Sequence, residues 1–243
     1  MTIRIFDDYE KLSQASAALM VDQIVRKPDS VICIPSGETP KGTFRHFVSL
    51  VKERNIDLSR VTFVGLDEWV GVPQDNPGSC GNFIRKWLLD PLRVSATRVY
   101  LFNGMANDLD AECNEMDSAI RKVGGLDFIL VGIGLNGHIG LNEPGTSPAL
   151  YSHVMELAPT TRDVGQKYFQ KNTVLTKGIT LGLKHVLDAS TALLIANGEK
   201  KASIIRSTVS GPIRMDVPST IMHKHPNGLI YLDMEAAGEL HND

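Results

Sequence analysis

Short apolar runs recur along this 243-residue chain, and each is followed by turn residues and then by helical periodicity. Several of the runs are continuously apolar, which is typical of strands that are covered on both faces. Their alternation with amphipathic stretches predicts an α/β fold, a three-layer αβα sandwich with a mostly parallel, Rossmann-like sheet. The predicted strands span residues 31–35, 61–66, 127–134, 191–196 and 228–232, and the predicted helices span 9–25, 41–54, 109–122 and 200–209.

The N-terminal segment alternates apolar and polar residues, so it predicts a first strand and not a signal peptide. Asp7 or Asp8 is suited to cap the helix that follows, because a short acidic side chain accepts hydrogen bonds from the amides of the first turn. We find no repeat, low-complexity tract or linker that would divide the chain. Residues 1–243 are therefore expected to form a single domain.

Composition and charge restrict the kind of partner. A net charge of −3 argues against nucleic acid or an anionic membrane surface, since such partners select a clustered basic excess. No apolar run approaches the roughly 20 residues of a membrane helix. Cys33, Cys80 and Cys113 form no CxxC pair, so neither a disulfide framework nor a zinc cluster is indicated. We expect a cytoplasmic protein that binds a small molecule. The sequence is also compatible with a homo-oligomer.

The loops that follow the apolar runs are where ligands should bind, because open α/β sheets bind beyond the carboxyl ends of their strands. In the first such loop, residues 36–43, glycine and small hydroxyl side chains allow backbone amides to surround a phosphate. Ser36, Gly37 and Thr39 are the candidate contacts. The loop matches neither a Walker nor a dinucleotide motif, and a plain strand-to-helix turn explains it equally well.

The second loop places two carboxylates, Asp67 and Glu68, directly after an apolar run. Adjacent side chains on an extended segment point to opposite sides, so one acid can face a cleft while the other is anchored in its wall. Asp67 is the candidate base. The alternative is that both acids are capping or solvated residues, the commoner fate of such a pair. The small polar residues of 76–82 favour the functional interpretation, because they can donate to sugar hydroxyls.

The third loop, residues 132–145, is rich in glycine and carries His138 and Glu143. The carboxylate can orient the imidazole and support its charged form, which gives a pair able to shuttle a proton near neutral pH. A structural histidine in a tight turn and a metal site are the alternatives. No second His or Cys lies at ligand spacing, so no metal is predicted.

Two of these segments, 66–71 and 134–144, resemble the signature sequences of the glucosamine-6-phosphate deaminase family. The resemblance covers nearly the whole chain, with 36–40 similar to the family's phosphate loop and 175–182 similar to a later substrate-side segment. Within that family, the sequences of 27–33, 122–127 and 178–184 are most similar to the branch identified as galactosamine-6-phosphate deaminase/isomerase.

The resemblance implies specific catalytic roles. Asp67 matches the family's proton abstractor at C2, His138 its ring-opening acid and base, and Glu143 the carboxylate partner of that histidine. Asn136 stands where the allosteric members carry an aspartate, which reduces the family's triad to His138 and Glu143. Because an unactivated C–H bond must be broken, we expect Asp67 to be partly desolvated and more basic than usual.

The resemblance also implies the substrate contacts and the reaction. Lys201 matches the family's phosphate-binding lysine, and its other phosphate cation falls at about Lys167, with Arg162 as a competitor. The implied substrate is glucosamine or galactosamine 6-phosphate, converted without metal or redox cofactor into fructose or tagatose 6-phosphate and ammonia. The family's effector-binding positions hold Thr146, His153, Met155 and Glu156 here, which predicts hyperbolic kinetics without an effector.

Two other functions remain in competition. A 6-phosphogluconolactonase-like hydrolase is similar in fold, but Trp69 stands where lactonases tend to carry arginine, and 142–144 differ from the lactonase ending. A non-catalytic sugar-phosphate sensor is the third hypothesis. Such sensors are fused to a DNA-binding module, and this sequence shows no basic helix-turn-helix segment.

Overall fold

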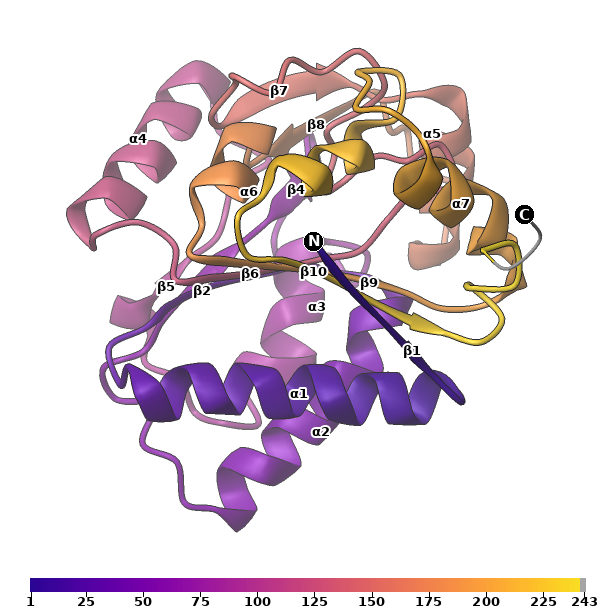
Figure 1. The fold of residues 1–243 in the computed structure, drawn as a ribbon. Helices are drawn as coiled ribbons and strands as arrows, with labels where there is room; N and C mark the ends of the chain where they lie inside the picture. The colour runs from indigo at the N-terminus through magenta and orange to yellow at the C-terminus, as the bar shows by residue number, and fades with distance from the viewer. Residues whose placement is uncertain (241–243) are drawn as a thin grey trace.

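The structure is a computed structural model that describes residues 1–240. Within these residues, seven strands form one sheet in which every pairing is parallel, in the order β1-β10-β9-β6-β2-β3-β5. The predicted α/β fold is confirmed, and the sheet lies between two helical layers (Figure 1). The strands are β1 (Thr2–Phe6), β2 (Val31–Ile34), β3 (Thr62–Gly65), β5 (Val99–Tyr100), β6 (Phe128–Val131), β9 (Thr191–Ala196) and β10 (Gly228–Asp233).

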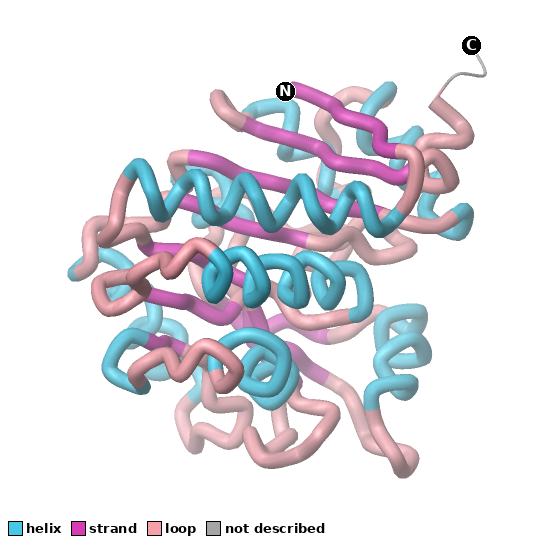
Figure 2. Tube along the Cα trace, turned by 90° about the horizontal axis from the view of Figure 1, so that it is seen from below, coloured by secondary structure: helices cyan, strands magenta, loops and turns pink. Residues whose placement is uncertain are grey.

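The two helical layers divide the core into two apolar clusters. One face of the sheet is covered by α1 (Tyr9–Arg26), α2 (Glu38–Glu53), α3 (Cys80–Ile84) and the following turn of π-helix η1 (Arg85–Leu89), with α1 and α2 side by side (Figures 1 and 2). The other face is covered by α4 (Leu109–Lys122), α6 (Leu183–Asp188), α7 (Ala202–Ser210) and η5 (Pro218–Lys224). Alternate residues of β2 enter opposite clusters, Val31 and Cys33 on one side and Ile32 and Ile34 on the other. Continuous apolarity therefore reflects burial of both strand faces.

Local sequence explains where the first two helices begin. Asp8 caps α1, because its carboxylate accepts a hydrogen bond from Lys11 N at 2.7 Å. The second helix begins at Glu38 and not at residue 41 as predicted, because Gly37 adopts φ 118° and turns the chain into the helix directly after β2. Among the described residues, no side chain caps α2, so its first amides are available to a ligand.

A small antiparallel sheet, which the sequence did not predict, joins the upper layer. It comprises β4 (Asp67–Trp69), β8 (Lys177–Thr180) and β7 (His153–Glu156), in the order β4-β8-β7 within the described chain. Beside it, α5 (Pro159–Gly165) and the 3-10 turn η3 (Gln166–Tyr168) form one short helical segment. Further 3-10 turns are η2 (Ala96–Arg98) and η4 (Glu199–Lys201).

The strand order places a crevice at one point of the main sheet. From β2 the chain proceeds outward to β3 and β5, whereas from β6 it proceeds in the opposite direction to β9 and β10. Because β2 and β6 are neighbours, the loops after them diverge and leave a crevice at their carboxyl ends, where α/β proteins bind ligands.

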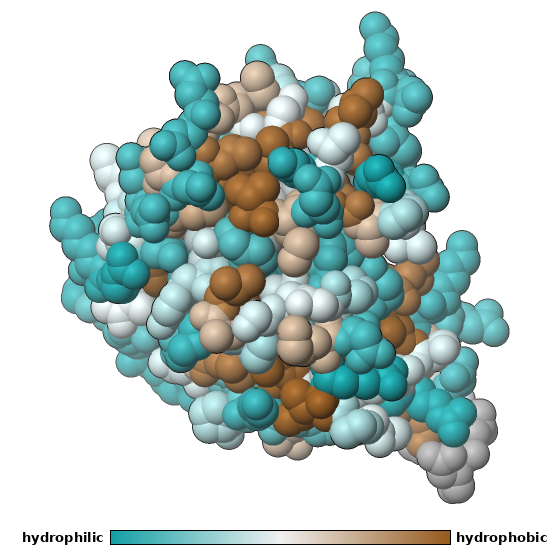
Figure 3. Space-filling model, turned by 90° about the horizontal axis from the view of Figure 1, so that it is seen from above, coloured by the Kyte–Doolittle hydropathy of each residue, from teal (hydrophilic) through white to brown (hydrophobic). Residues whose placement is uncertain are grey.

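The surface above the upper layer shows apolar side chains only in patches separated by polar ones (Figure 3). Of the helices within residues 1–240, none is both long and apolar enough to cross a bilayer.

Candidate active site

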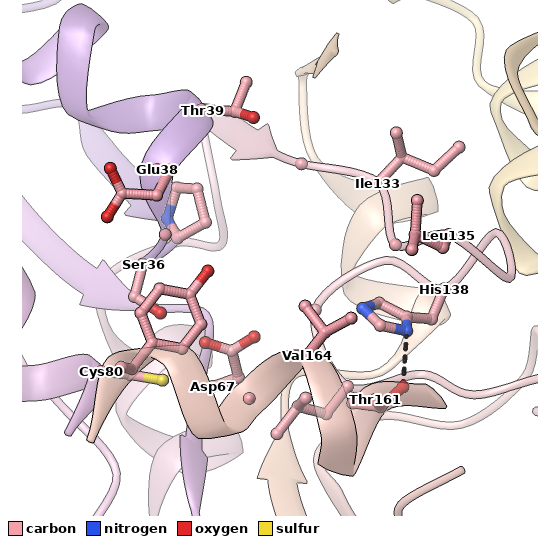
Figure 4. Close-up of a pocket in the computed structure, with 18 of the residues that line it drawn as sticks. Ser36, Glu38, Thr39, Asp67, Cys80, Ile133, Leu135, His138, Thr161 and Val164 are labelled. Atoms are coloured by element: carbon pink, nitrogen blue, oxygen red, sulfur yellow. Dashed lines mark hydrogen bonds between the residues drawn. The ribbon is translucent and has the colours of Figure 1, made fainter. Parts of the chain in front are cut away.

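A pocket opens at the predicted crevice, and its wall is built from the loops after β2, β3, β6 and β9 together with the α5–η3 segment. Asp67 and His138 come from separate strand ends and both line this pocket, as the sequence predicted (Figure 4). Most of the predicted substrate contacts lie in the same wall: Ser36, Gly37, Thr39, Lys167 and Lys201.

The positively charged end of the pocket is formed by the N-terminus of α2 and two lysines. Ser36, Gly37 and the start of α2 line the pocket, so uncapped amides and the positive end of the helix dipole face it. Lys201 Nζ donates a hydrogen bond to Ile133 O at 2.6 Å. Burial, together with the neighbouring charge of Lys167, lowers the pKa of Lys201 to about 8. The two lysine charges repel each other, so a bound anion would stabilise this part of the pocket.

The sequence left Lys167 and Arg162 as competitors for the second cation. Lys167 lines the pocket, and its Nζ lies 4.9 Å from the ring centroid of Tyr168, which is also a lining residue. Arg162 is exposed and is not among the lining residues of the described chain. The structure therefore brings Lys167, and not Arg162, to the pocket. Asn136 lines the pocket as well.

The two carboxylates of β4 point to opposite sides, as predicted. Glu68 is buried and accepts hydrogen bonds from the amides of Trp69, Cys80 and Gly81 at 2.9 Å and from the Ser79 hydroxyl at 2.6 Å. These donors satisfy both carboxylate oxygens and fix the loop after β4. Glu68 is therefore an anchor in the wall, which leaves its neighbour to face the pocket.

Asp67 is half-buried, and its Oδ1 is buried without a hydrogen-bond partner among the described residues. Burial and the adjacent negative charge of Glu68 raise the pKa of Asp67 to about 7, against a lowering contact from the Cys80 thiol. The predicted partial desolvation of Asp67 is present, and it is the main cause of the raised pKa. A carboxylate in this state can accept a proton at neutral pH, which an ordinary surface aspartate does poorly.

The imidazole of His138 lies on the other side of the pocket from the first residues of α2 (Figure 4). Its Nδ1 is 3.5 Å from Glu143 Oε2 and 3.2 Å from the hydroxyl of Thr161. Glu143 is buried, and its carboxylate accepts hydrogen bonds from Asn136 Nδ2 at 2.7 Å and from Ala158 N at 3.2 Å. The predicted pairing of His138 with Glu143 is present, but a third side chain takes part in it.

Electrostatics favour an ionised Glu143 beside the imidazole. Burial would raise the pKa of Glu143, but hydrogen bonding and charge interaction with His138, with further hydrogen bonds from Thr161 and Asn136, lower it to about 2. A buried carboxylate that remains ionised can accept a hydrogen bond from the imidazole beside it. The pair can therefore take up and release protons during a reaction.

Sequence reasoning missed the side chains that α5–η3 and the loop after β4 contribute. Thr161, Tyr168 and Cys80 all line the pocket. They come from short helical segments outside the strand ends of the main sheet, so no local pattern marks them. Within residues 1–240, no group of His, Cys, Asp and Glu side chains is arranged to hold a metal ion.

The fold and the pocket together define a doubly wound α/β protein whose crevice has two lysines at one end and a carboxylate and an imidazole in its wall. Comparison with known proteins gives the family. Residues 7–231 match the family described as glucosamine-6-phosphate isomerases/6-phosphogluconolactonase. The chain therefore belongs to the glucosamine-6-phosphate isomerase/6-phosphogluconolactonase family.

Individual relatives match over their full length. The glucosamine-6-phosphate deaminase of Alkaliphilus oremlandii is 36% identical over 241 residues, which cover 99% of this chain and 100% of the relative. A solved structure of a monomeric glucosamine-6-phosphate deaminase superposes with a TM-score of 0.95 at 35% identity, covering 98% of this chain and 100% of the other. The 6-phosphogluconolactonase of Trypanosoma brucei, at 19% identity, a TM-score of 0.74 and 98% coverage of both chains, shares the fold.

Proposed function

We propose that this protein is an isomerising deaminase that converts a 2-amino-2-deoxyhexose 6-phosphate into the corresponding 2-ketohexose 6-phosphate and ammonia. One observation carries the proposal: a carboxylate with a pKa of about 7 shares a pocket with two lysines and with an imidazole that is backed by the buried carboxylate of Glu143. The reaction needs each of these parts, a base for a carbon acid, an acid and base for ring opening, and cations for the phosphate.

The pocket geometry supports different roles for its two ends. Lys201, Lys167 and the amides at the start of α2 hold the phosphate, which fixes the sugar relative to the other groups. His138, with Glu143 as its partner, transfers a proton from O1 to O5 and opens the pyranose ring. Asp67 then removes the proton from C2 of the open-chain aldehyde, O1 is protonated, and an enolamine results.

The same carboxyl group returns its proton to C1, and the nitrogen releases one proton, which balances the one added to O1 and leaves an imine at C2. Water adds to that imine, the C–N bond breaks, and ammonia leaves behind the ketone. The proton on Asp67 is thus recovered within one turnover, so its pKa near neutrality suits both the abstraction and the return. Each of these proton transfers can be carried by a side chain of the pocket.

The relatives support the glucosamine epimer as the first substrate, since those reported above are named glucosamine-6-phosphate deaminases. The resemblance of 27–33, 122–127 and 178–184 to the other branch makes galactosamine 6-phosphate the second candidate. The purified protein should be incubated with each epimer in parallel while ammonia and the ketohexose 6-phosphate are followed. Release of ammonia from neither epimer, with hydrolysis of 6-phosphogluconolactone instead, would reassign the protein to the lactonase activity.

The proposed enzyme obeys simple saturation kinetics. The positions that hold an effector in the allosteric members are Thr146, His153, Met155 and Glu156, which provide no cationic cluster for a sugar phosphate. Rate curves should therefore be hyperbolic, with no response to an N-acetylated amino-sugar phosphate. A sigmoidal curve that the effector relieves would contradict this part of the proposal.

A further inference from the structure

Thr161 contacts the imidazole of the acid/base pair. It is buried in the first turns of α5, and its hydroxyl is 3.2 Å from His138 Nδ1, nearer than the Glu143 carboxylate at 3.5 Å (Figure 4). The direct contact between imidazole and carboxylate is therefore at the long end of the hydrogen-bond range. The nearer partner of the ring comes from a different part of the fold, 23 residues further along the chain.

The hydrogen-bonding capacity of the groups determines the direction of each bond. Glu143 Oε2 lies 3.5 Å from Nδ1 of the imidazole, and an ionised carboxylate can only accept, so Nδ1 faces an acceptor on that side. The Thr161 hydroxyl lies 3.2 Å from the same ring nitrogen, and its oxygen can accept a hydrogen bond from it as well. Nδ1 of the imidazole must then be the donor, which assigns the proton of the neutral ring to Nδ1.

The other ring nitrogen is left for the pocket. A side chain at Gly134 would place its Cβ 2.4 Å from His138 Nε2, so the absence of a side chain there makes room for the ring. Gly134 is itself a lining residue. Nε2 is thus the nitrogen that can exchange a proton with a bound sugar, provided that Nδ1 keeps its own proton.

We propose that Thr161 is a positioning residue whose hydroxyl, together with Glu143, accepts from Nδ1 of His138, holds the imidazole in the Nδ1-protonated tautomer, and so leaves Nε2 to carry the proton between O1 and O5. The part about O1 and O5 rests on the proposed deaminase function, whereas the tautomer does not. Without the hydroxyl, the ring keeps only the longer contact to Glu143, and the wrong tautomer becomes populated.

The decisive variant is Thr161→Val, which keeps the shape of the side chain and removes the hydroxyl. We expect kcat to fall by about 10- to 100-fold, within the contribution of general acid–base catalysis. Ring opening should become rate-limiting, so the kinetic isotope effect with substrate deuterated at C2 should fall toward one. Thr161→Ser restores the hydroxyl and should keep kcat within about threefold of the parent enzyme. Thr97→Val, an exposed position outside the pocket, is the matched control.

Nitrogen-15 NMR of the histidine rings reads the tautomer without any turnover, with His138→Gln used to assign the signal. We expect a protonated Nδ1 in the parent protein and in Thr161→Ser, and a mixture in Thr161→Val. A Thr161→Val enzyme with unchanged kcat, or with lower kcat but an unchanged isotope effect and tautomer, would overturn the proposal. If neither amino-sugar phosphate is a substrate, the deaminase function fails, and the NMR result still decides the role of Thr161.

Discussion

Replacing the carboxylate of Asp67 by an amide should abolish turnover and, at the same time, make the protein more stable. The pKa of Asp67 is raised from 3.8 to about 7 by burial and by the charge of Glu68. A difference of about three pKa units corresponds to about 4 kcal/mol of unfavourable interaction with the ionised form. This figure is a ceiling, because Asp67 is only half-buried and solvent screens part of the interaction.

The sign of this effect follows from proton linkage. Below pH 3.8 the carboxyl group is protonated in both the folded and the unfolded chain, and it makes no difference to stability. As the pH rises, the unfolded chain ionises first, so the free energy of unfolding decreases until the folded carboxyl also ionises at about pH 7. Asp67→Asn, which cannot ionise, should therefore gain nothing near pH 4 and up to about 4 kcal/mol at pH 8.

Urea unfolding of both proteins at pH 4, 6 and 8 measures this gain, and ammonia release measures the loss of turnover. Asp75→Asn is the control, because Asp75 is exposed and lies outside the pocket. The control should differ little from the parent at any pH. The free energy of unfolding of Asp67→Asn should exceed that of the parent by an amount that grows with pH. An increase that is absent, or equal at all three pH values, would refute the argument that the folded protein disfavours the ionised form of Asp67. Near-normal turnover would remove Asp67 from the role of base.

Three further changes test the anchoring and anion-binding parts of the site. In the parent protein, hydrogen-bond donors surround the Glu68 carboxylate, and Glu68→Gln would place an NH2 group against some of them, so the free energy of unfolding in urea should fall by about 2–3 kcal/mol. A loss below about 0.5 kcal/mol would contradict the anchoring role. The pKa of Lys201 is about 8, so kcat/KM should decline as the pH rises through that value. Lys201→Met should lower kcat/KM about tenfold or more and abolish this alkaline limb, and an unaltered limb would exclude Lys201 as its source. Gly37 has φ 118° at the start of α2, so Gly37→Ala should cost about 1–3 kcal/mol of stability and raise KM for phosphorylated substrate. Urea unfolding and initial rates measure the two effects. Unchanged values would mean that the loop tolerates a side chain.

The layered core and part of the site could be predicted from sequence because they depend on local patterns. The apolar runs identify strands buried on both faces, and the ends of such strands meet at one edge of the sheet. This reasoning brought Asp67 and His138 together across a separation of 71 residues. Alternation along an extended segment also predicted that Asp67 and Glu68 would face opposite ways.

Other features had no local signal. The small sheet pairs β4 with β8, which begin 110 residues apart, and its strands are only three and four residues long, too short for a recognisable periodicity. Trp69 of that sheet shares an apolar cluster with Tyr168 of η3. The α5–η3 segment brings Lys167, and not Arg162, to the pocket and Thr161 to the imidazole. Spacing alone predicted Glu143 as the partner of His138, but it could not reveal that a hydroxyl lies closer.

The sequence by itself determined the αβα layers, the edge of the sheet that carries the site, and the chemical groups present there. Burial and strand periodicity are written into neighbouring residues, and the parallel sheet converts strand ends into a shared edge. Only the tertiary structure decided which cation faces the pocket, how strongly Asp67 is desolvated, and which groups contact the imidazole. Those properties are set by distances of a few ångströms between segments far apart in the chain, and electrostatic and hydrogen-bond energies change steeply over such distances.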